Sequence, residues 1–324
     1  PAGWSSIGNG DKVAEAHDAR QWSSTWRNVI PVCYLTAVAG RYHETSAESG
    51  SVRVSAWLLT PSDTRAEQIC RTTAQAISYF TKAFSPYPYQ AYTVVESRIF
   101  PPALEGYSFM FAGSGNLPDV IPHEVSHTWW GGLVPCTYTH SMWNEAFATY
   151  SESLFRRFHV SGISEDPGAG AAAAANSLPT RPSLLEVKDA MHPAHSAIGY
   201  EKGSRVLAQL ERWIGSDAML RAMKDFVARH PHGEAADWPD FVAAAVRVAG
   251  PEAGEFLWPW LREGRFPEYG LHDVRVTEDG ANYRVQGFVK ASAPVHYCLA
   301  PLRVIAADGP TDTAVRVRAV SVPF

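Results

Sequence analysis

The sequence lacks any run of roughly 18–20 consecutive apolar residues, which is the length that a membrane-spanning helix needs. No membrane span is therefore expected in this chain of 324 residues. An excess of basic residues is also absent: 28 Lys and Arg stand against 33 Asp and Glu, for a net charge of −5. Because a broad nucleic-acid surface needs a basic excess, nucleic acid is not expected as a partner.

Cysteine is scarce, and the four cysteines are far apart in the sequence: Cys33, Cys70, Cys136 and Cys298. Without a Cys-x-x-Cys pair, a zinc site built from cysteines is not expected. Buried single thiols are the simplest interpretation, with two disulfides as the alternative. Free thiols favour the cytoplasm. The first 30 residues contain no visible signal peptide, but the chain also lacks an initiator Met, so the soluble part of an exported or membrane-attached protein is the alternative.

The chain is 46% hydrophobic, which is typical of a globular protein with two domains or one large domain and an appendage. Residues 1–60 are predicted to be β-rich, and the alternation over 51–59 predicts a strand. Helical spacing predicts helices at 64–84 and at about 119–131, 142–158, 200–214, 216–230, 238–249 and 252–263. A period of two follows Phe266. The predicted parts are therefore 1–60, 61–265 and 266–324, and the alanine tract 168–176 is interpreted as a loop or short helix without chemistry.

The segment IPHEVSHTWW contains the pattern His-Glu-x-x-His, formed by His123, Glu124 and His127. Residues four apart lie on the same face of a helix, so both imidazoles can reach one metal ion. Glu124 follows the first ligand directly and can act as a general base on water at the metal. The simpler alternative is a pair of surface histidines on an ordinary helix.

A candidate third ligand follows on the next predicted helix, in the segment HSMWNEAFATYSE. Glu145 supplies the carboxylate that a His₂Glu catalytic zinc site takes in addition to two histidines, with the fourth position left for water. The histidine that metzincins have six residues after the second histidine is absent, because Leu133 occupies that position. Glu152 lies two turns beyond Glu145 and could orient a ligand histidine; a solvated helix charge is the alternative.

Four segments, which keep the family's order along the chain, resemble the aminopeptidase N family of zinc metallopeptidases (peptidase family M-one). HEVSHTWWGGLV and WNEAFATYSE match the family's zinc-binding segments. PALEG at 102–106 resembles the family's G-A-M-E-N motif, and YEKG at 200–203 resembles the segment with its catalytic tyrosine. WRNVIPVCYLTAVAGRYHE and FLWPWLREGRFPEYGLHDVRV resemble the flanking regions, so the resemblance covers nearly the whole chain.

The resemblance implies an α+β fold that is mainly α. A thermolysin-like helical catalytic domain (61–265) would be flanked by the end of an N-terminal β domain (1–60) and a β-sandwich-like C-terminal module (266–324). It also implies one zinc ion per chain, held by His123, His127 and Glu145.

The same resemblance implies how this site would act on a peptide or small amide. Glu124 would be the general base, and Tyr200 would donate to the developing oxyanion. Glu105, with Ala103 and Leu104 beside it, would bind the α-ammonium group of the substrate. The expected function is that of a zinc-dependent aminopeptidase of small peptides.

The sequence departs from the family pattern at three points. The 17 residues between His127 and Glu145 are one fewer than usual, and we interpret the change as a shorter loop before the second helix. Pro102 and Gly106 replace the Gly and Asn that flank the family's G-A-M-E-N motif. The chain also begins near the end of the family's first domain, so further domains of a longer protein are expected. These departures motivate two alternatives: a binding or scaffold protein of the same fold without peptidase activity, and a zinc amidase or peptidase with a non-standard substrate.

The remaining histidines and tryptophans carry weaker signals. His140, His192 and His195 are interpreted as surface or structural histidines, and Trp129 and Trp130 as packing residues.

Overall fold

The computed structural model describes residues 3–18, 22–28, 35–99, 103–115, 117–159, 181–230, 233–280, 282–306 and 309–324. Cys33, Pro102 and the alanine tract 168–176 lie outside the described residues. The chain divides into two compact units: unit 1 is Pro1–Tyr138, Asn144–Glu165 and Lys224–Asp237, and unit 2 is Thr139–Trp143, Asp166–Met223 and Trp238–Phe324. Of the residues, 37% are helical and 34% lie in strands, which is a more even mixture than the mainly α composition that was predicted. Across the described ranges, no helix is both long enough and apolar enough to cross a bilayer.

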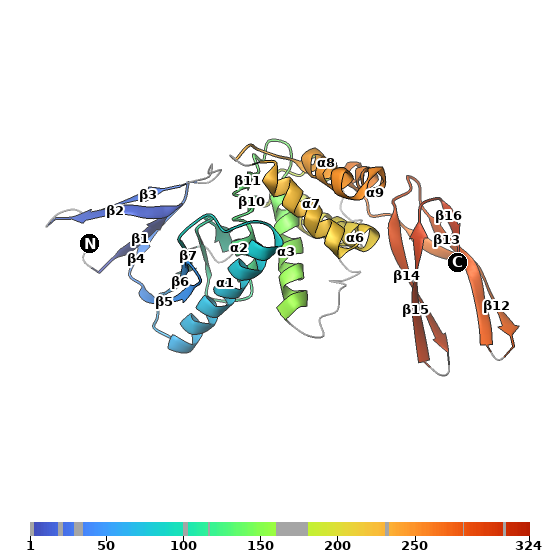
Figure 1. Cartoon of the computed structure of the whole chain (residues 1–324), viewed down its shortest axis with the longest axis horizontal. Helices are drawn as coiled ribbons and strands as arrows, with labels where there is room; N and C mark the ends of the chain where they lie inside the picture. The colour runs from blue at the N-terminus through green and yellow to red at the C-terminus, as the bar shows by residue number, and fades with distance from the viewer. Residues whose placement is uncertain are drawn as a thin grey trace. The chain divides into compact units, whose positions relative to one another are not determined.

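Unit 1 contains a five-stranded sheet with the strand order β5-β6-β7-β9-β8. Figure 1 labels three of these strands, β5, β6 and β7. The strands are β5 (His43–Ser49), β6 (Val52–Leu58), β7 (Ala91–Ser97), β8 (Ala103–Glu105) and β9 (Phe109–Gly113). The three central strands are parallel, and the edge strands β5 and β8 pair antiparallel with their neighbours. Because β5 and β6 precede residue 60 and β7 follows it, this sheet runs across the domain boundary that the sequence predicted there.

Helix α1 (Asp63–Ala83) covers one face of this sheet and agrees with the helix predicted over 64–84 (Figure 1). Its apolar residues recur at helical spacing and are buried, among them Ile69 and Phe80, both 0% exposed. The Cys70 thiol donates to the carbonyl oxygens of Thr45 and Val54, at 3.6 and 3.9 Å. Cys70, Cys136 and Cys298 are buried free thiols, as predicted.

Four N-terminal strands form two antiparallel pairs, β1 (Ser5–Gly8) with β4 (Ala37–Gly40) and β2 (Asp11–His17) with β3 (Trp22–Arg27). Of these strands, β1, β3 and β4 pack against the sheet through Ile7, Trp26 and Val38. A buried apolar cluster joins them to the sheet, and its members are Ile7, Trp57, Val95 and Phe109. The alternation over 51–59 predicted this strand, β6; Trp57, on the face opposite Val54 and Ala56, is also buried, because β1 packs there.

The metal-motif region of unit 1 follows β9. It contains α2 (Ile121–Ser126), the two-residue strands β10 (Trp130–Gly131) and β11 (Val134–Pro135), and α3 (Trp143–His159). The predicted helix 119–131 was too long, because the backbone tightens after Ser126 and Gly131 adopts a φ of +108°. Trp129 and Trp130 are fully buried and pack against other aromatic rings, as predicted.

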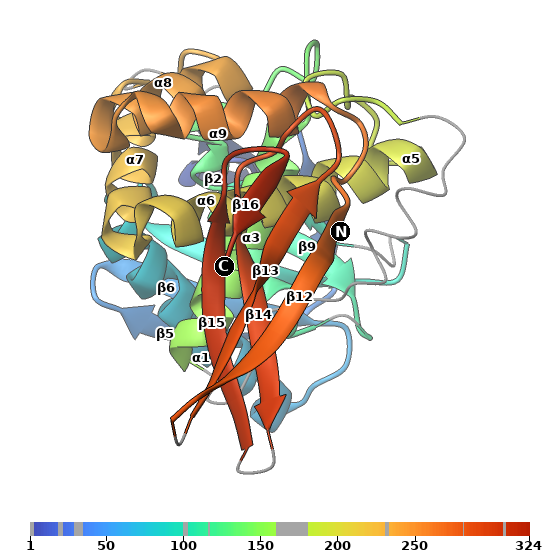
Figure 2. The same cartoon turned by 90° about the vertical axis from the view of Figure 1, so that its right-hand side faces the viewer.

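Beyond residue 181, the chain continues with helices and then strands. The helical part comprises α5 (Pro193–Ser196), the π-helix η1 (Ala197–Lys202), α6 (Gly203–Ile214), α7 (Ser216–Ala228), α8 (Trp238–Ala249) and α9 (Pro251–Arg262). The helices agree with the predicted ranges to within a few residues, but η1 was not foreseen. The strands are β12 (Tyr269–Asp279), β13 (Asn282–Ala291), β14 (Cys298–Ala306), β15 (Gly309–Val317) and β16 (Ser321–Pro323). They form a three-stranded sheet, β12-β13-β16, and a separate hairpin, β14-β15 (Figure 2).

Candidate metal centre

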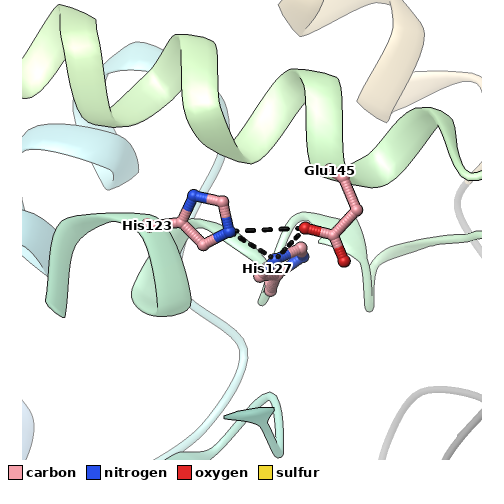
Figure 3. Close-up of side chains that lie close together, drawn as sticks. All are labelled: His123, His127 and Glu145. Carbon is pink, nitrogen blue, oxygen red and sulfur yellow. Dashed lines mark hydrogen bonds and ion pairs between the residues drawn. The ribbon is translucent and has the colours of Figure 1, made fainter. Parts of the chain in front are cut away.

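The side chains of His123, His127 and Glu145 in unit 1 bring one potential ligand atom each within 4.8 Å of the other two (Figure 3). His123 lies on α2 and His127 directly follows this helix, while Glu145 projects toward both imidazoles from the first turn of α3. The two Nε2 atoms are 3.2 Å apart. Oε2 of Glu145 is 3.4 Å from each of them. The shorter spacer before Glu145 therefore leaves its carboxylate beside both histidines.

These distances can be compared with the geometry of a zinc site. Zinc binds imidazole nitrogen and carboxylate oxygen at about 2.0–2.1 Å, mostly with tetrahedral geometry. The edge of a tetrahedron is about 1.63 times its centre-to-vertex distance, so two such ligand atoms should lie about 3.3 Å apart. The observed separations of 3.2, 3.4 and 3.4 Å fit this edge length. The donor set, two nitrogens and one carboxylate oxygen, is also the one that catalytic zinc sites of the His₂Glu class use.

Both histidines are oriented through their other ring nitrogen. Nδ1 of His127 lies 2.9 Å from the carbonyl oxygen of Trp130, to which it can donate its proton. Nδ1 of His123 lies 3.6 Å from Oε2 of Glu152 on α3. The sequence spacing of Glu152 from Glu145 indicated this orienting contact as one of two alternatives. A proton on Nδ1 leaves the lone pair of Nε2 for a metal, which is the usual arrangement of ligand histidines.

The electrostatics of the site favour a positive charge. Burial lowers the pKa of both imidazoles, but the nearby carboxylates outweigh it and raise both pKa values above the ordinary range. For His123 these carboxylates are mainly Glu145 and Glu152, and for His127 they are Glu105 and Glu145. Burial also opposes ionisation of Glu145, yet the two imidazoles hold its pKa well below the ordinary value. A site that stabilises imidazolium in this way also suits a divalent cation.

A second group of side chains extends the same pocket. Ligand atoms of Glu105, Glu124 and His127 lie within 4.8 Å of one another, and all three residues are buried. Burial raises the pKa of Glu124, as do the carboxylates of Glu105 and Glu145, against the effect of the imidazoles. Oε2 of Glu124 makes no hydrogen bond within the described part of the chain. Since His127 belongs to both groups, the two glutamates lie beside the candidate metal position.

The other predicted site residues lie as follows. Ala103 and Leu104 precede Glu105 on the edge strand β8, and both are half-buried. Tyr200 is half-buried in η1 of unit 2, so its role stays a prediction. His140 and His192 are exposed, and His195 is half-buried with its Nδ1 accepting from the backbone N–H groups of Lys188 and Asp189.

Two features of the pocket were not foreseen from the sequence. The first is the carbonyl oxygen of Trp130, which lies beside Nδ1 of His127. It is brought there by the tight turns of the backbone after Ser126. The second is Tyr92 on β7, which is fully buried and whose hydroxyl makes no hydrogen bond among the described residues. Burial raises its pKa most, and the charges of Glu124 and Glu105 raise it further. In the sequence, Tyr92 is an ordinary aromatic residue of a strand, so no local signal marks it.

The comparisons of this chain with known proteins agree on one family. Residues 70–260 match the model of the peptidase family M1 domain. Aminopeptidase N of Lactobacillus helveticus is 31% identical over 178 residues, which are 50% of this chain and 20% of that protein. Aminopeptidase 2 of Candida albicans is 26% identical over 188 residues, 54% of this chain and 20% of that protein. The matched part thus spans about a fifth of the length of these curated relatives.

Solved structures agree at the level of the fold. An M1 zinc metallopeptidase from Deinococcus radiodurans has a TM-score of 0.67 at 22% identity, covering 83% of this chain and 62% of that one. A mutant of the enzyme bound to a Tyr-Ser-Ala substrate has a TM-score of 0.69 at 23% identity, with 83% and 63% covered. The family match over more than half of the chain, together with these likenesses, shows that this protein belongs to peptidase family M1.

Proposed function

We propose that this chain hydrolyses the amino-terminal peptide bond of small peptides at a zinc ion held by His123, His127 and Glu145. The observation that carries the proposal is the spacing of 3.2–3.4 Å between the three ligand atoms, which fits a tetrahedral site. Membership of family M1 and the aminopeptidase names of the curated relatives support the same reaction. Zinc at this position supplies Lewis acidity, which acidifies water and polarises the scissile carbonyl.

Glu124 is proposed as the general base. Its carboxylate is buried beside the ligand cluster, its pKa is raised mainly by burial, and its Oε2 is free to accept a proton within the described part of the chain. A base with a raised pKa accepts the proton of water more readily near neutral pH than an ordinary carboxylate. The same residue would later pass this proton to the leaving amine.

Glu105 is proposed to bind the α-ammonium group of the substrate. Its carboxylate lies in the same pocket as Glu124 and His127, within 4.8 Å of both. A charge-assisted hydrogen bond to an ammonium group at this position would hold the first residue of the peptide and leave the next bond at the metal. Ala103 and Leu104, on the same edge strand, are proposed to line the approach of the substrate.

Tyr200 is proposed as the donor to the developing oxyanion, on the strength of the YEKG segment. One such donor typically contributes about 3–4 kcal/mol to transition-state stabilisation. We further propose that residues 61–265 form a thermolysin-like catalytic domain and that residues 1–60 are the end of an N-terminal β domain, whose last strands β5 and β6 join the sheet of the catalytic domain. Residues 266–324 are proposed to form a β-sandwich-like module.

The proposal is tested with zinc-loaded wild-type protein and two isosteric variants, Glu124→Gln and Glu48→Gln. Glu48 is exposed on β5 and serves as the matched control. Each protein is assayed on a fluorogenic aminoacyl amide with a free or an acetylated amino terminus. We expect hydrolysis of the free substrate by the wild type and by Glu48→Gln, and a loss of at least about 100-fold in Glu124→Gln.

Each other result has a definite meaning. Equal hydrolysis of the acetylated substrate would keep the zinc chemistry and remove the role of Glu105, which favours the amidase alternative. A zinc-loaded, folded wild type without activity on any substrate would favour the scaffold alternative. Unchanged activity in Glu124→Gln would overturn the proposed role of this residue.

A further inference from the structure

The carboxylate of Glu105 is carried by a short element at the edge of the sheet. Strand β8 has three residues and, among the strands that the structure describes, pairs with β9 alone. A tight turn joins the two strands, in which the N–H of Gly106 donates to the carbonyl oxygen of Phe109 at 2.7 Å. Tyr107 in this turn has a φ of +64°, an uncommon conformation for a non-glycine residue. The position of Glu105 therefore depends on what holds the turn.

On one side, the turn is held by Asn9, which follows strand β1. Nδ2 of Asn9 donates to the carbonyl oxygen of Gly106 at 3.0 Å, across 97 positions of the sequence. Oδ1 of the same side chain accepts from the N–H of Thr36 at 2.7 Å. Asn9 is 6% exposed, so both hydrogen bonds are sheltered from water. One buried amide thus ties the residue next to Glu105 to the N-terminal strands.

The next residue adds a second hydrogen bond to the same turn. The N–H of Gly10 donates to Oγ of Ser108 at 2.8 Å. Gly10 has a φ of +96°, and a Cβ atom at this position would lie 2.2 Å from the carbonyl oxygen of Arg27. Only glycine fits here, and it directs its N–H to the turn. Ile7 on β1 and Phe109 at the end of the turn belong to one buried apolar cluster, so apolar packing also joins strand β1 to the turn.

On its other side, the turn contacts the metal-motif region. Oγ1 of Thr128 donates to the carbonyl oxygen of Tyr107 at 2.7 Å, and Thr128 directly follows His127. The turn is thus held between the N-terminal strands and the residue after a candidate metal ligand. We propose that Asn9 is a positioning residue for substrate binding: by holding the Glu105–Phe109 turn, it sets the place of the Glu105 carboxylate relative to the metal, and with it the preference for ligands that carry a free amino group.

The physical reason is the steep dependence of an ion-paired hydrogen bond on geometry. In Asn9→Asp, a carboxylate oxygen would replace the Nδ2 donor and face the carbonyl oxygen of Gly106 without a proton between them. The Gly106 carbonyl oxygen also accepts from the N–H of Ser108 at 2.8 Å and would keep that hydrogen bond. The buried carboxylate oxygen would nevertheless lie against this carbonyl oxygen without a donor of its own, which is costly, so the turn should move. Within the described residues, the Asn9 side chain hydrogen-bonds to Gly106 and Thr36, so zinc binding should stay unchanged.

The proposal rests on the proposed function, in which Glu105 binds the substrate amine. Its test measures the binding of two probes to zinc-loaded protein by calorimetry: leucine hydroxamate and the same hydroxamate without the α-amino group. The ratio of the two affinities reports the amine site, while the second probe alone reports the metal. Asp11→Asn is the matched control, because Asp11 lies two residues away and accepts from the N–H of Gln90 instead.

In Asn9→Asp, we expect the affinity ratio to fall by about 5-fold or more, with the affinity of the amine-free probe within about 2-fold of the wild type. Ser108→Ala, which removes the acceptor of the Gly10 N–H, should lower the ratio in the same direction, and it provides the test if Asn9→Asp does not fold. Asp11→Asn should leave both affinities unchanged. A ratio that stays at the wild-type value in the folded variants would overturn the proposal. If the wild type itself shows no preference for the amino probe, the role of Glu105 fails first, and the positioning role fails with it.

Discussion

Glu152 offers a sharp test of the metal site, because it is the side chain that orients one ligand without being a ligand itself. Its Oε2 lies 3.6 Å from Nδ1 of His123, and its side chain is 23% exposed. The corresponding contact of His127 is made by the carbonyl oxygen of Trp130, which no side-chain substitution removes. Replacing Glu152 therefore changes the orientation and basicity of His123 alone.

The expected magnitude follows from this contact. Loss of a carboxylate behind a ligand histidine typically weakens metal binding by about 10–100-fold. Since 3.6 Å is longer than a normal hydrogen bond and the group is partly exposed, we expect the lower end of this range in Glu152→Gln. This is about 10-fold in Kd for zinc, or about 1.4 kcal/mol. Glu152→Ala, which also removes the acceptor, should weaken binding at least as much.

The assay is a zinc titration in competition with a chromophoric chelator. Ser153→Ala is one control, because Ser153 is an exposed neighbour on α3 whose hydroxyl donates to the carbonyl oxygen of Thr149. Arg156→Gln is the other, because Arg156 pairs with Oε1 of Glu152 at 2.8 Å and both Glu152 variants lose this ion pair. Both controls should bind zinc like the wild type. If both Glu152 variants also kept the wild-type affinity, the reasoning about His123 would be refuted.

Three further predictions concern stability. In Gly106→Ala, the new Cβ atom would lie 2.5 Å from the ring of the fully buried Phe109, so the free energy of unfolding should fall by about 1–3 kcal/mol in a denaturant titration, and an unchanged value would contradict this packing. Burial opposes ionisation of Glu96, but hydrogen bonds from Ser114, Arg65 and the N–H of Leu59 outweigh it and lower its pKa. The ionised Glu96 carboxylate therefore contributes fully to stability above the ordinary carboxyl pKa, and this contribution is lost as the pH falls through the lowered pKa. Glu96→Gln should flatten the acid limb of a plot of melting temperature against pH. Equal slopes in the variant and the wild type would argue against this role of Glu96. Removal of zinc by a chelator should lower the melting temperature and abolish hydrolysis, and added zinc should restore both. The reason is that a ligand of the native state stabilises this state by about 4 kcal/mol when its concentration is a thousand times its Kd. A melting temperature that does not respond to the chelator would contradict a zinc site.

The parts of the fold with strong local patterns were predicted well. Helix α1 has a regular apolar stripe from Ala66 to Phe80, and both ends lie within one residue of the predicted ones. The strands beyond Phe266 were also foreseen, from the period of two at positions such as Val274, Val276, Tyr283 and Val285. The N-terminal strands were harder, because sequences such as SSIG and WSSTWR contain few β-branched residues and owe their structure to distant partners.

The candidate site was predictable in its motif residues and not in its surroundings. His123, His127 and Glu145 are marked by spacing on two helices, and helical geometry brings them together. Helix α2 nevertheless ends at Ser126 instead of continuing to residue 131, since the backbone must turn to offer the Trp130 carbonyl to His127. The contact of Asn9 with Gly106 spans 97 positions, so no local pattern announces it.

One zinc ion held jointly by His123, His127 and Glu145 is the basis of every role proposed above. The most direct measurement is X-ray diffraction from zinc-loaded crystals, with anomalous data collected on both sides of the zinc absorption edge. We expect a single strong anomalous peak at about 2.0–2.1 Å from Nε2 of both histidines and from a carboxylate oxygen of Glu145. A zinc ion found elsewhere, or one that Glu145 does not contact, would contradict this expectation.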